Sequence, residues 1–226
     1  MAPIHDAALN GDVETLRRLL AEGVSPDVTD DLAKTPLHCL CICDHGGNSA
    51  ACFELLRDAG ANFEVSNSLG YRPLHFAAFF GNVRLLSLLV QSGVNVDAAI
   101  NGGSTTLQIA ARQCNAVCVE VLLAAGADID VRNPGGKPFE IALEKGLRRT
   151  WPLFLRAGAE IPNHNTDPYI VRVRGAGGFQ KYSQQHLARI TSILAPTPLL
   201  PPELVRHVVS FWLHAGWYLG RPGEGR

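Results

Sequence analysis

The chain has 226 residues, which is enough for one or two domains with a sizeable core. Hydrophobic residues make up 46% and charged residues 18%, a globular composition that excludes a disordered chain. The net charge of -1 gives no overall basic excess for nucleic-acid binding, and no run reaches the roughly 18 apolar residues that a membrane span needs.

The N-terminal stretch 1–8 has neither the basic and apolar regions of a secretory signal nor the Arg- and Ser-rich composition of a transit segment. We therefore expect a cytoplasmic or nuclear location. The cysteines should then be reduced, since such compartments keep thiols free.

One short pattern recurs through residues 1–162. Its clearest copy, residues 71–93, reads as a turn, a short apolar helix, a Gly-Asn break, a second amphipathic helix and a closing glycine. The second residue of each turn-to-helix anchor steps by 33, 37, 33 and 32, and the closing glycines step by 37, 33, 33 and 32. The anchor positions are Pro3, Pro36, Pro73, Thr106 and Pro138, and the glycines are Gly23, Gly60, Gly93, Gly126 and Gly158. Two independent markers with one period predict stacked repeats.

The pattern has a physical basis in each unit. Proline in the first helical turn has a preset φ and wastes no N–H, and Thr35 just before Pro36 can cap that helix. Glycine after the second helix is the residue expected at a helix stop. Neither helix is long enough to bury its own apolar face, so neighbouring units must supply the core.

The motif Thr-Pro-Leu-His, followed by Leu-Leu-x-x-Gly-Ala at a 33-residue period, resembles the ankyrin repeat. The match is closest in residues 35–67, 71–97 and 105–133. The resemblance implies an all-α solenoid of helix-turn-helix units with β-turn fingers, a concave protein-binding face and no catalysis. We expect an ankyrin domain over 1–162, with units of about 1–30, 31–67, 68–100, 101–133 and 134–162.

Four units depart from the pattern: the first lacks its leading turn, and the fourth has Thr106 and Gln108 in place of proline and histidine. The second carries about four extra residues around Cys43–Ser49, which predicts a bulged loop between its helices. The fifth has Lys137 in place of threonine and Pro152 near the start of its second helix, as in a terminal unit or a junction.

The six cysteines are Cys39, Cys41, Cys43, Cys52, Cys114 and Cys118. Three of them alternate beside His38, so a metal site is one interpretation. Cys41, however, falls where other units have alanine, and Cys52 and Cys118 fall at an apolar position of the second helix. Small buried side chains suit such positions, so we predict structural cysteines, no metal and no cofactor.

The ankyrin resemblance implies that the candidate binding face lies on the fingers and the exposed side of the first helices, which together would form the concave face. Its third unit is unusually aromatic, and clustered exposed rings beside an arginine are typical of binding hot spots. The alternative is that the rings pack into the core. The predicted protein-binding residues are Tyr71, Arg72, Phe76, Phe79, Phe80, Arg112 and Gln113.

His38 and His75 occupy the anchor position, where the imidazole can hydrogen-bond the backbone of the adjacent finger. We interpret them as structural. No Ser/His/Asp, Cys/His/Asn, phosphate-loop or HExxH pattern is present, so we predict no catalytic residue and no enzyme.

After residue 162 the period stops. Residues 163–181 read as a polar linker that includes a short β-prone stretch, Tyr169–Arg174. Two amphipathic helices, 183–194 with Ser183 as N-cap and a second one through 202–213, predict a helical hairpin over 182–226. The scattered basic residues indicate a solvated surface rather than a nucleic-acid site.

The stretch from Leu200 to Leu213 looks like the opening of an F-box and also like the second half of a SOCS box. Both resemblances imply docking to a cullin ubiquitin ligase, through its F-box-binding linker or through elongin. The docking residues would be Leu200, Pro201, Glu203, Leu204, Val208, Phe211 and Trp212. The alternative is that the hairpin caps the last repeat and buries Trp151 and Phe154.

The sequence therefore predicts a non-catalytic adaptor that holds a protein partner on its concave face, and the F-box and SOCS-box resemblances imply the role of a ubiquitin ligase substrate receptor. The alternative is a structural subunit or assembly factor bound permanently in a larger complex.

Overall fold

A computed structural model describes residues 2–194 of the chain. These residues form twelve helices and no extended sheet, which confirms the all-α prediction. Chain contacts divide the molecule into an N-terminal body, Met1–Lys145, and a C-terminal body, Gly146–Arg226. No helix of the described residues is long and apolar enough to cross a membrane.

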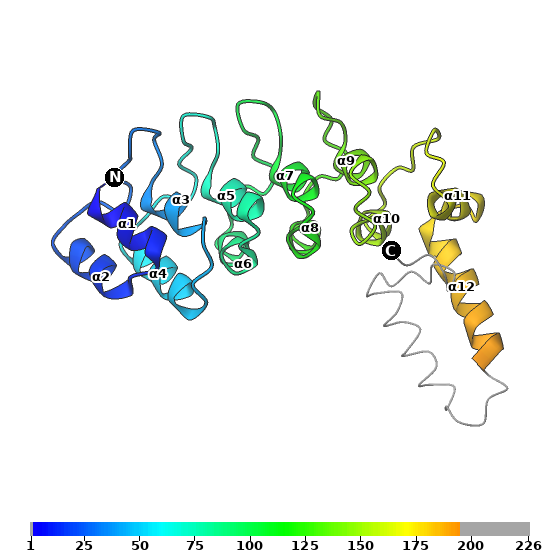
Figure 1. Ribbon diagram of the computed structural model, residues 1–226, viewed down its shortest axis with the longest axis horizontal. Helices are drawn as coiled ribbons and strands as arrows, with labels where there is room; N and C mark the ends of the chain where they lie inside the picture. Colours follow the sequence, from blue (N-terminus) through cyan, green and yellow to red (C-terminus); the bar gives the residue numbers. More distant parts are fainter. Residues whose placement is uncertain (1, 195–226) are drawn as a thin grey trace. The chain divides into compact units, whose positions relative to one another are not determined.

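The N-terminal body is built from helices in sequential pairs (Figure 1). Its first helices are α1 (Pro3–Asn10), α3 (Pro36–Leu40), α5 (Pro73–Phe80), α7 (Thr106–Arg112) and α9 (Pro138–Glu144). Its second helices are α2 (Val13–Ala21), α4 (Gly47–Asp58), α6 (Val83–Gln91) and α8 (Ala116–Ala124). First helices pack on first helices and second on second, in the order α1·α3·α5·α7·α9 and α2·α4·α6·α8. The predicted solenoid is confirmed.

Each first helix begins as the sequence predicts. Proline lies in the first turn of α1, α3, α5 and α9, where its missing N–H costs nothing. The residue before α3, Thr35, is extended and shares a capping box with His38, and Thr105 does the same with Gln108 before α7.

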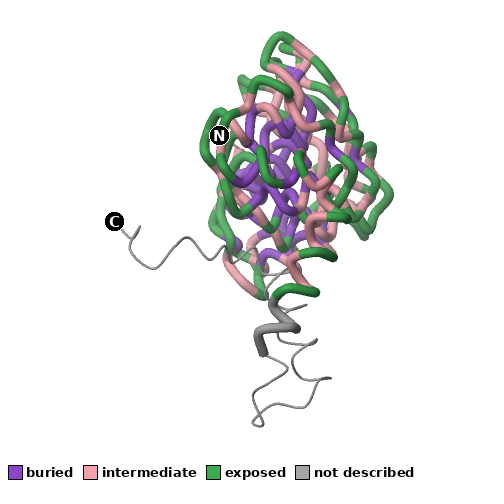
Figure 2. Tube along the Cα trace, turned by 90° about the vertical axis from the view of Figure 1, so that its right-hand side faces the viewer, coloured by how far each residue is buried: buried purple, intermediate pink, exposed green. Residues whose placement is uncertain are grey.

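The second helices bury one apolar stripe between the layers. In α6 the buried residues are Leu85, Leu86 and Leu89, at helical spacing. Each fully buried leucine contributes roughly 1.5–3 kcal/mol relative to an exposed one. Buried residues gather in the interior of the trace in Figure 2, and each helix packs on its equivalents in the neighbouring units, so the core is shared between units and not enclosed within any one of them.

Loops between the pairs form fingers that lie side by side. The backbone N–H of Ser68 donates to the Leu32 carbonyl at 3.1 Å, and that of Asn101 donates to the Leu69 carbonyl at 3.2 Å. These bonds join the fingers of units two, three and four into one row, which Figure 1 shows along the upper edge of the helix pairs. A row of joined fingers beside the first helices gives a continuous surface on which a partner can lie.

The extra residues of the second unit form the predicted bulged loop between α3 and α4. Its His45 lies against Gly11, where an added Cβ would come within 2.7 Å of the ring, and its Nε2 bonds the Leu9 carbonyl at 2.7 Å. The loop therefore fills the groove beside the end of α1.

The described part of the C-terminal body contains α10 (Trp151–Arg156), α11 (Pro168–Gly175) and α12 (Phe179–Leu194), with Pro152 in the first turn of α10 as predicted. Helix α12 packs on both α10 and α11. The ring of Tyr169 stacks on Trp151 at 6.2 Å and meets Tyr182 edge-on at 5.7 Å, so aromatic contacts join the three helices. Trp151 and Phe154 are buried, as the capping alternative requires of them.

Two sequence predictions for this body were wrong. The stretch Tyr169–Arg174 is helical, because Pro168 starts a turn that the Asp167 side chain caps by accepting the Tyr169 N–H at 2.8 Å. Helix α12 begins at Phe179, and Ser183 lies inside it, donating its hydroxyl to the Gln180 carbonyl at 2.8 Å. The predicted linker 163–181 thus contains α11 and the first turn of α12. The predicted helix over 202–213 lies outside the described residues.

One turn of the array carries strain that a substitution should relieve. Cys114 follows α7 with φ of 65°, at the position where α1 and α5 are followed by Gly11 and Gly81 with φ of 65° and 73°. A side chain in this left-handed conformation costs roughly 1–2 kcal/mol, partly offset by the greater freedom of glycine in the unfolded chain. We expect Cys114→Gly to stabilise the protein by about 0.5–1 kcal/mol in urea unfolding, whereas Cys114→Ser, which keeps the Cβ, should not. Equal stability of the two variants would contradict the strain.

Candidate functional site

A ladder of anchor side chains holds each first helix to the next finger. The Nδ1 atoms of His38 and His75 accept the N–H of their own N-cap residues at 3.1 and 3.0 Å. Their Nε2 atoms therefore carry the proton and donate to the carbonyls of Tyr71 at 2.9 Å and Ala98 at 2.8 Å. Both rings are fully buried, which confirms their structural role.

The ladder continues into unit four and ends in unit five, because a different side chain stands at the anchor position of each. Gln108 reproduces it in unit four: its oxygen accepts the Thr105 N–H at 2.9 Å, and its amide donates to the Gly136 carbonyl at 2.6 Å. Glu140 of unit five accepts the Lys137 N–H at 2.9 Å but has no N–H to donate, and it pairs with Arg132 of its own finger at 2.8 Å. The Lys137 N–H bond, then Arg132, lower the pKa of the Glu140 carboxyl.

Burial strongly favours the neutral form of the two histidines. Loss of hydration on burial lowers the pKa of His38 to about 4 and that of His75 to about 4, although each ring also binds a carbonyl that favours the charged form. A second proton on either ring would sit on Nδ1, where it would point at the N-cap N–H whose hydrogen bond Nδ1 now accepts. These groups therefore position the fingers and remain neutral near pH 7.

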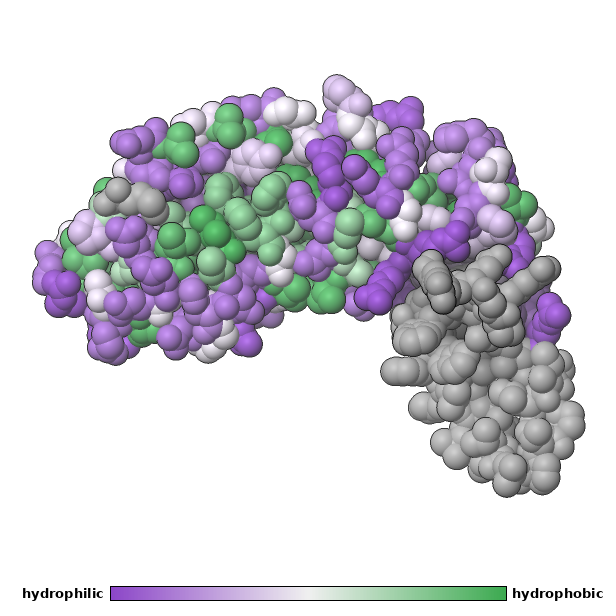
Figure 3. Space-filling view, viewed as in Figure 1, coloured by the Kyte–Doolittle hydropathy of each residue, from purple (hydrophilic) through white to green (hydrophobic). Residues whose placement is uncertain are grey.

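Large exposed hydrophobic side chains gather on units two and three. Of the six in the described residues, four lie there: Leu32 and Leu69 at two neighbouring finger tips, 59% and 65% exposed, and Phe79 and Phe80 at the end of α5, 43% and 47% exposed. Figure 3 shows hydrophobic residues collected over α3 and α5 on this side of the array. Such a patch is typical of an interaction site.

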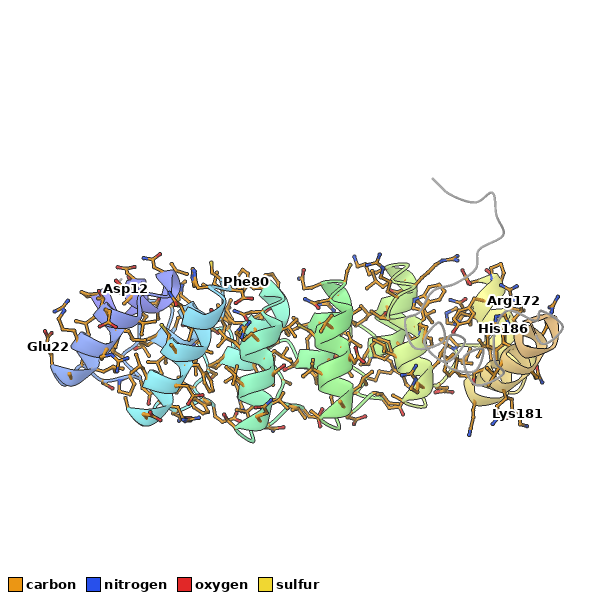
Figure 4. The ribbon with its side chains drawn as sticks, turned by 90° about the horizontal axis from the view of Figure 1, so that it is seen from below. Asp12, Glu22, Phe80, Arg172, Lys181 and His186 are labelled. Carbon is orange, nitrogen blue, oxygen red and sulfur yellow. The ribbon has the colours of Figure 1, made fainter. Side chains whose placement is uncertain are left out.

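The rings of unit three form one connected cluster around a shallow pocket. Phe80 meets Phe79 at 5.1 Å and Phe76 at 5.9 Å between ring centroids, and Phe76 meets Tyr71 at 5.9 Å and His38 at 5.2 Å. The pocket has a volume of about 200 Å³. It is lined by Asn67, Leu69, Tyr71, Phe76, Phe79 and Phe80. Phe80 is labelled at the end of α5 in Figure 4.

The structure brings together four of the seven residues predicted for the face. Tyr71, Phe76, Phe79 and Phe80 line the pocket, with Phe76 half-buried against His38, so this ring is partly core as the alternative held. Arg112 and Gln113 are exposed one unit further along, at the end of α7.

Arg72 and Leu32 differ from the sequence-based picture. The guanidinium of Arg72 is half-buried and ion-paired with Glu64, whose other oxygen accepts the Asn95 N–H at 2.7 Å, so it braces the finger. Leu32 was not predicted as a site residue. Aligning the fingers would have found it, because it precedes Leu69 by the same 37 residues that separate the two anchors.

The predicted C-terminal docking residues, from Leu200 to Trp212, lie outside the described residues. The six cysteines are free. Cys39, Cys41, Cys52 and Cys118 are buried, as predicted for structural positions, and burial raises the pKa of Cys39 and Cys52 to about 11 and that of Cys118 to about 12. Cys43 and Cys114 are exposed. Within residues 2–194 no group of three or more His, Cys, Asp or Glu side chains could hold a metal ion.

Comparison with known proteins identifies the architecture. A family model described as ankyrin repeats (3 copies) matches residues 4–100 and 42–133. Together these ranges cover more than half of the 226 residues. The chain belongs to the ankyrin-repeat family. The ankyrin resemblance inferred from the Thr-Pro-Leu-His anchors is thereby confirmed for residues 4–133. The comparison with protein families gives no support for an F-box or a SOCS box.

Several curated proteins share this ankyrin segment. Inversin from Danio rerio is 37% identical over 87 residues, which are 38% of this chain and 8% of that protein. Ankyrin repeat domain-containing protein 37 from Homo sapiens is 37% identical over 83 residues, 36% of this chain and 49% of that protein. Stress-activated protein kinase alpha from Dictyostelium discoideum is 35% identical over 71 residues, 31% and 11% of the two chains. The matches thus span less than half of each relative.

Proposed function

We propose that this ankyrin-repeat protein is a non-catalytic adaptor that holds a protein partner on the concave face of units two to four. The observation that carries the proposal is the apolar surface made by Leu32, Leu69, Phe79 and Phe80, four of the six large exposed hydrophobic residues of the described part. Exposed aromatic side chains of this kind anchor protein interfaces, and burying them provides most of the binding free energy.

The chemistry of the pocket supports binding rather than a reaction. Its walls are rings and an aliphatic side chain, and its polar member, Asn67, has its amide oxygen occupied by the N–H groups of Leu69 at 3.0 Å and Tyr71 at 2.9 Å. The two nearest imidazoles, His38 and His75, are buried and committed to backbone bonds. The wall residues supply apolar contact, and none of them apart from Tyr71, with its phenol hydroxyl, carries an acid or base group.

The first test removes the two exposed rings. Phe79→Ser with Phe80→Ser should reduce the amount of a specifically bound protein recovered from cells by at least about ten-fold, because hot-spot rings contribute around 2 kcal/mol each. Val117→Ser on α8, which removes a hydrophobic side chain that is 50% exposed, is the matched control and should leave recovery unchanged. Equal loss in both variants, or no loss in either with the fold intact by circular dichroism, would sink the proposal.

The same recovery distinguishes an adaptor from a permanent subunit. A permanent subunit buries a large interface and stays at fixed stoichiometry through a high-salt wash, whereas an adaptor of this interface size exchanges.

A narrower form of the proposal makes the chain a substrate receptor of a cullin ubiquitin ligase in the cytoplasm or nucleus. It rests on the sequence from Leu200 to Leu213 alone. Deleting residues 195–226 leaves α12 complete, whereas cutting at 183 would remove most of the helix that packs on α10. Cullin components recovered with the full chain and lost with this deletion would support the role. Recovery that the deletion leaves unchanged, or their absence from both samples, would remove it.

A further inference from the structure

We propose that the partner contributes a single apolar side chain to the unit-three pocket and a carboxylate to Arg112, one unit further along. This deepens the proposed function, on which it rests, by stating the chemistry of the segment that binds. The occupant is an extended segment of a partner protein in which an aromatic or leucine side chain and an Asp or Glu lie more than about 10 Å apart.

The size of the pocket sets the first half of the motif. Sites for small-molecule ligands usually enclose about 300–1,000 Å³. The pocket beside Phe79 and Phe80 has about 200 Å³ and is open to solvent, which suits one large side chain and no more. Its rings hold one another through edge contacts of 5.1 to 5.9 Å, so little side-chain freedom is lost when a partner binds.

The position of Arg112 sets the second half. Arg112 follows Phe79 by one 33-residue period and therefore occupies the same place on α7 that Phe79 occupies on α5. Adjacent packed helices lie about 8–10 Å apart, and the Arg112 guanidinium reaches on to Gly135 in the finger of unit five, so it lies more than about 10 Å along the face from the pocket. An extended chain covers about 3.3 Å per residue, which puts the carboxylate more than about three residues from the anchor.

The guanidinium of Arg112 is available to a ligand. It forms no hydrogen bond or ion pair with any residue that the structure describes, in contrast to Arg132 in the next finger, which binds Glu140. The Nη2 atom of Arg112 lies over Gly135, only 2.8 Å from the place where a Cβ of residue 135 would be. Because glycine has no Cβ, the guanidinium has room on the face. A free guanidinium binds a carboxylate with two parallel charge-assisted hydrogen bonds.

Charge on the opposite flank gives the motif a direction. Asp31 is exposed beside Leu32 at the finger tip of unit two, whereas Asp44, exposed in the loop after α3, is ion-paired with Arg84 at 3.9 Å. Asp31 repels an acidic group on the bound segment, because the two charges are alike, whereas the opposite charge of Arg112 attracts it. The segment therefore lies with its acidic end toward unit four.

A random 12-residue peptide library displayed on phage and selected against the immobilised full chain tests this directly. We expect enriched peptides to pair an aromatic residue or leucine with Asp or Glu at a fixed spacing of more than about three positions. Against Arg112→Glu the same library should enrich Lys or Arg at that position. Peptides selected on the natural chain should bind Arg112→Glu at least about ten-fold more weakly, and Arg17→Glu, an exposed change of equal charge on α2, should leave binding intact.

The outcomes separate the two levels of the proposal. Apolar anchors enriched without an acidic preference, or a preference unchanged in Arg112→Glu, would overturn the carboxylate site and leave the apolar face standing. Enrichment that is the same on Phe79→Ser/Phe80→Ser as on the natural chain would overturn the face itself. Circular dichroism and urea unfolding of each variant establish that the fold is retained.

Discussion

The protein should lose about 5 kcal/mol of folding stability when the pH falls from 7.5 to 4.5, and His38 and His75 should account for the loss. Each folded-state pKa is about 4, against 6.5 for an unperturbed histidine. The unfolded chain therefore binds protons that the folded chain refuses, so stability is full above about pH 7, falls as the pH drops through 6.5 and levels off below 4. A difference of 2.5 pKa units amounts to about 3 kcal/mol for each ring at the limit, of which most is lost by pH 4.5.

The array itself supplies the control. Gln108 makes the same two bonds in unit four without a titrating group, accepting from Thr105 and donating to Gly136. His38→Gln with His75→Gln should therefore keep stability near its original value at pH 7.5 and remove most of the decline to pH 4.5 in urea unfolding. Each single substitution should remove about half. A double variant with an unchanged pH dependence would show that the buried imidazoles are not responsible.

Gly70→Ala should cost about 3 kcal/mol, the second largest effect we expect. Gly70 has φ of 82°, and a Cβ there would lie 2.5 Å from the backbone nitrogen of Asn101, closer than Cβ atoms come to other atoms. That nitrogen donates the bond to Leu69 that joins fingers three and four. The side chain adds conformational strain of roughly 1–2 kcal/mol and forces apart a backbone hydrogen bond worth about 1 kcal/mol.

Gly103 is the equivalent glycine of the next finger and serves as the control. Its φ is 76°, but the nearest atom to a Cβ there is 3.8 Å away. Gly103→Ala should therefore cost only the conformational part, about 1 kcal/mol. The difference between the two variants in the free energy of unfolding, measured in urea, gives the contribution of the contact between the fingers. Equal losses would mean that the close approach of Gly70 to Asn101 contributes nothing.

The fold was predictable because it repeats. Three residues of each unit act through local geometry: the proline that starts a helix, the histidine three residues after the N-cap and the glycine that ends the helix pair. Their spacing therefore predicts the units without knowledge of any partner. The same reasoning predicted that Cys41, Cys52 and Cys118 are buried, since each replaces a core residue of a neighbouring unit.

The candidate site was predictable in part. The aromatic residues of unit three stand out against polar equivalents, and Phe79 and Phe80 prove exposed. The pairing of Arg72 with Glu64 and the half-burial of Phe76 depend on how the finger folds over α5, which the period does not encode. Leu32 stands four residues before Pro36, as Leu69 stands four before Pro73, so the period places it on a finger tip but does not show that it is exposed.

The C-terminal body was the least predictable, because it has no repeat to set a register. The residues Tyr169, Ile170 and Val173 are β-prone by type, yet they are buried in helix α11, which packs on α12. Val173 lies one helical turn after the other two, so all three share one face of the helix. A proline, an aspartate cap and packing against a neighbour outweigh intrinsic preference over so short a stretch.

The exposed thiols give the most direct measurement of where a partner binds. Cys43 and Cys114 follow the first helices of units two and four, on either side of Phe79 and Phe80, while the other four cysteines are buried. In the free protein two thiols should react with a maleimide under native conditions and four only after denaturation. With the recovered partner bound, the account predicts that alkylation of both Cys43 and Cys114 slows together. A bound partner that leaves both rates unchanged would contradict binding across the concave face.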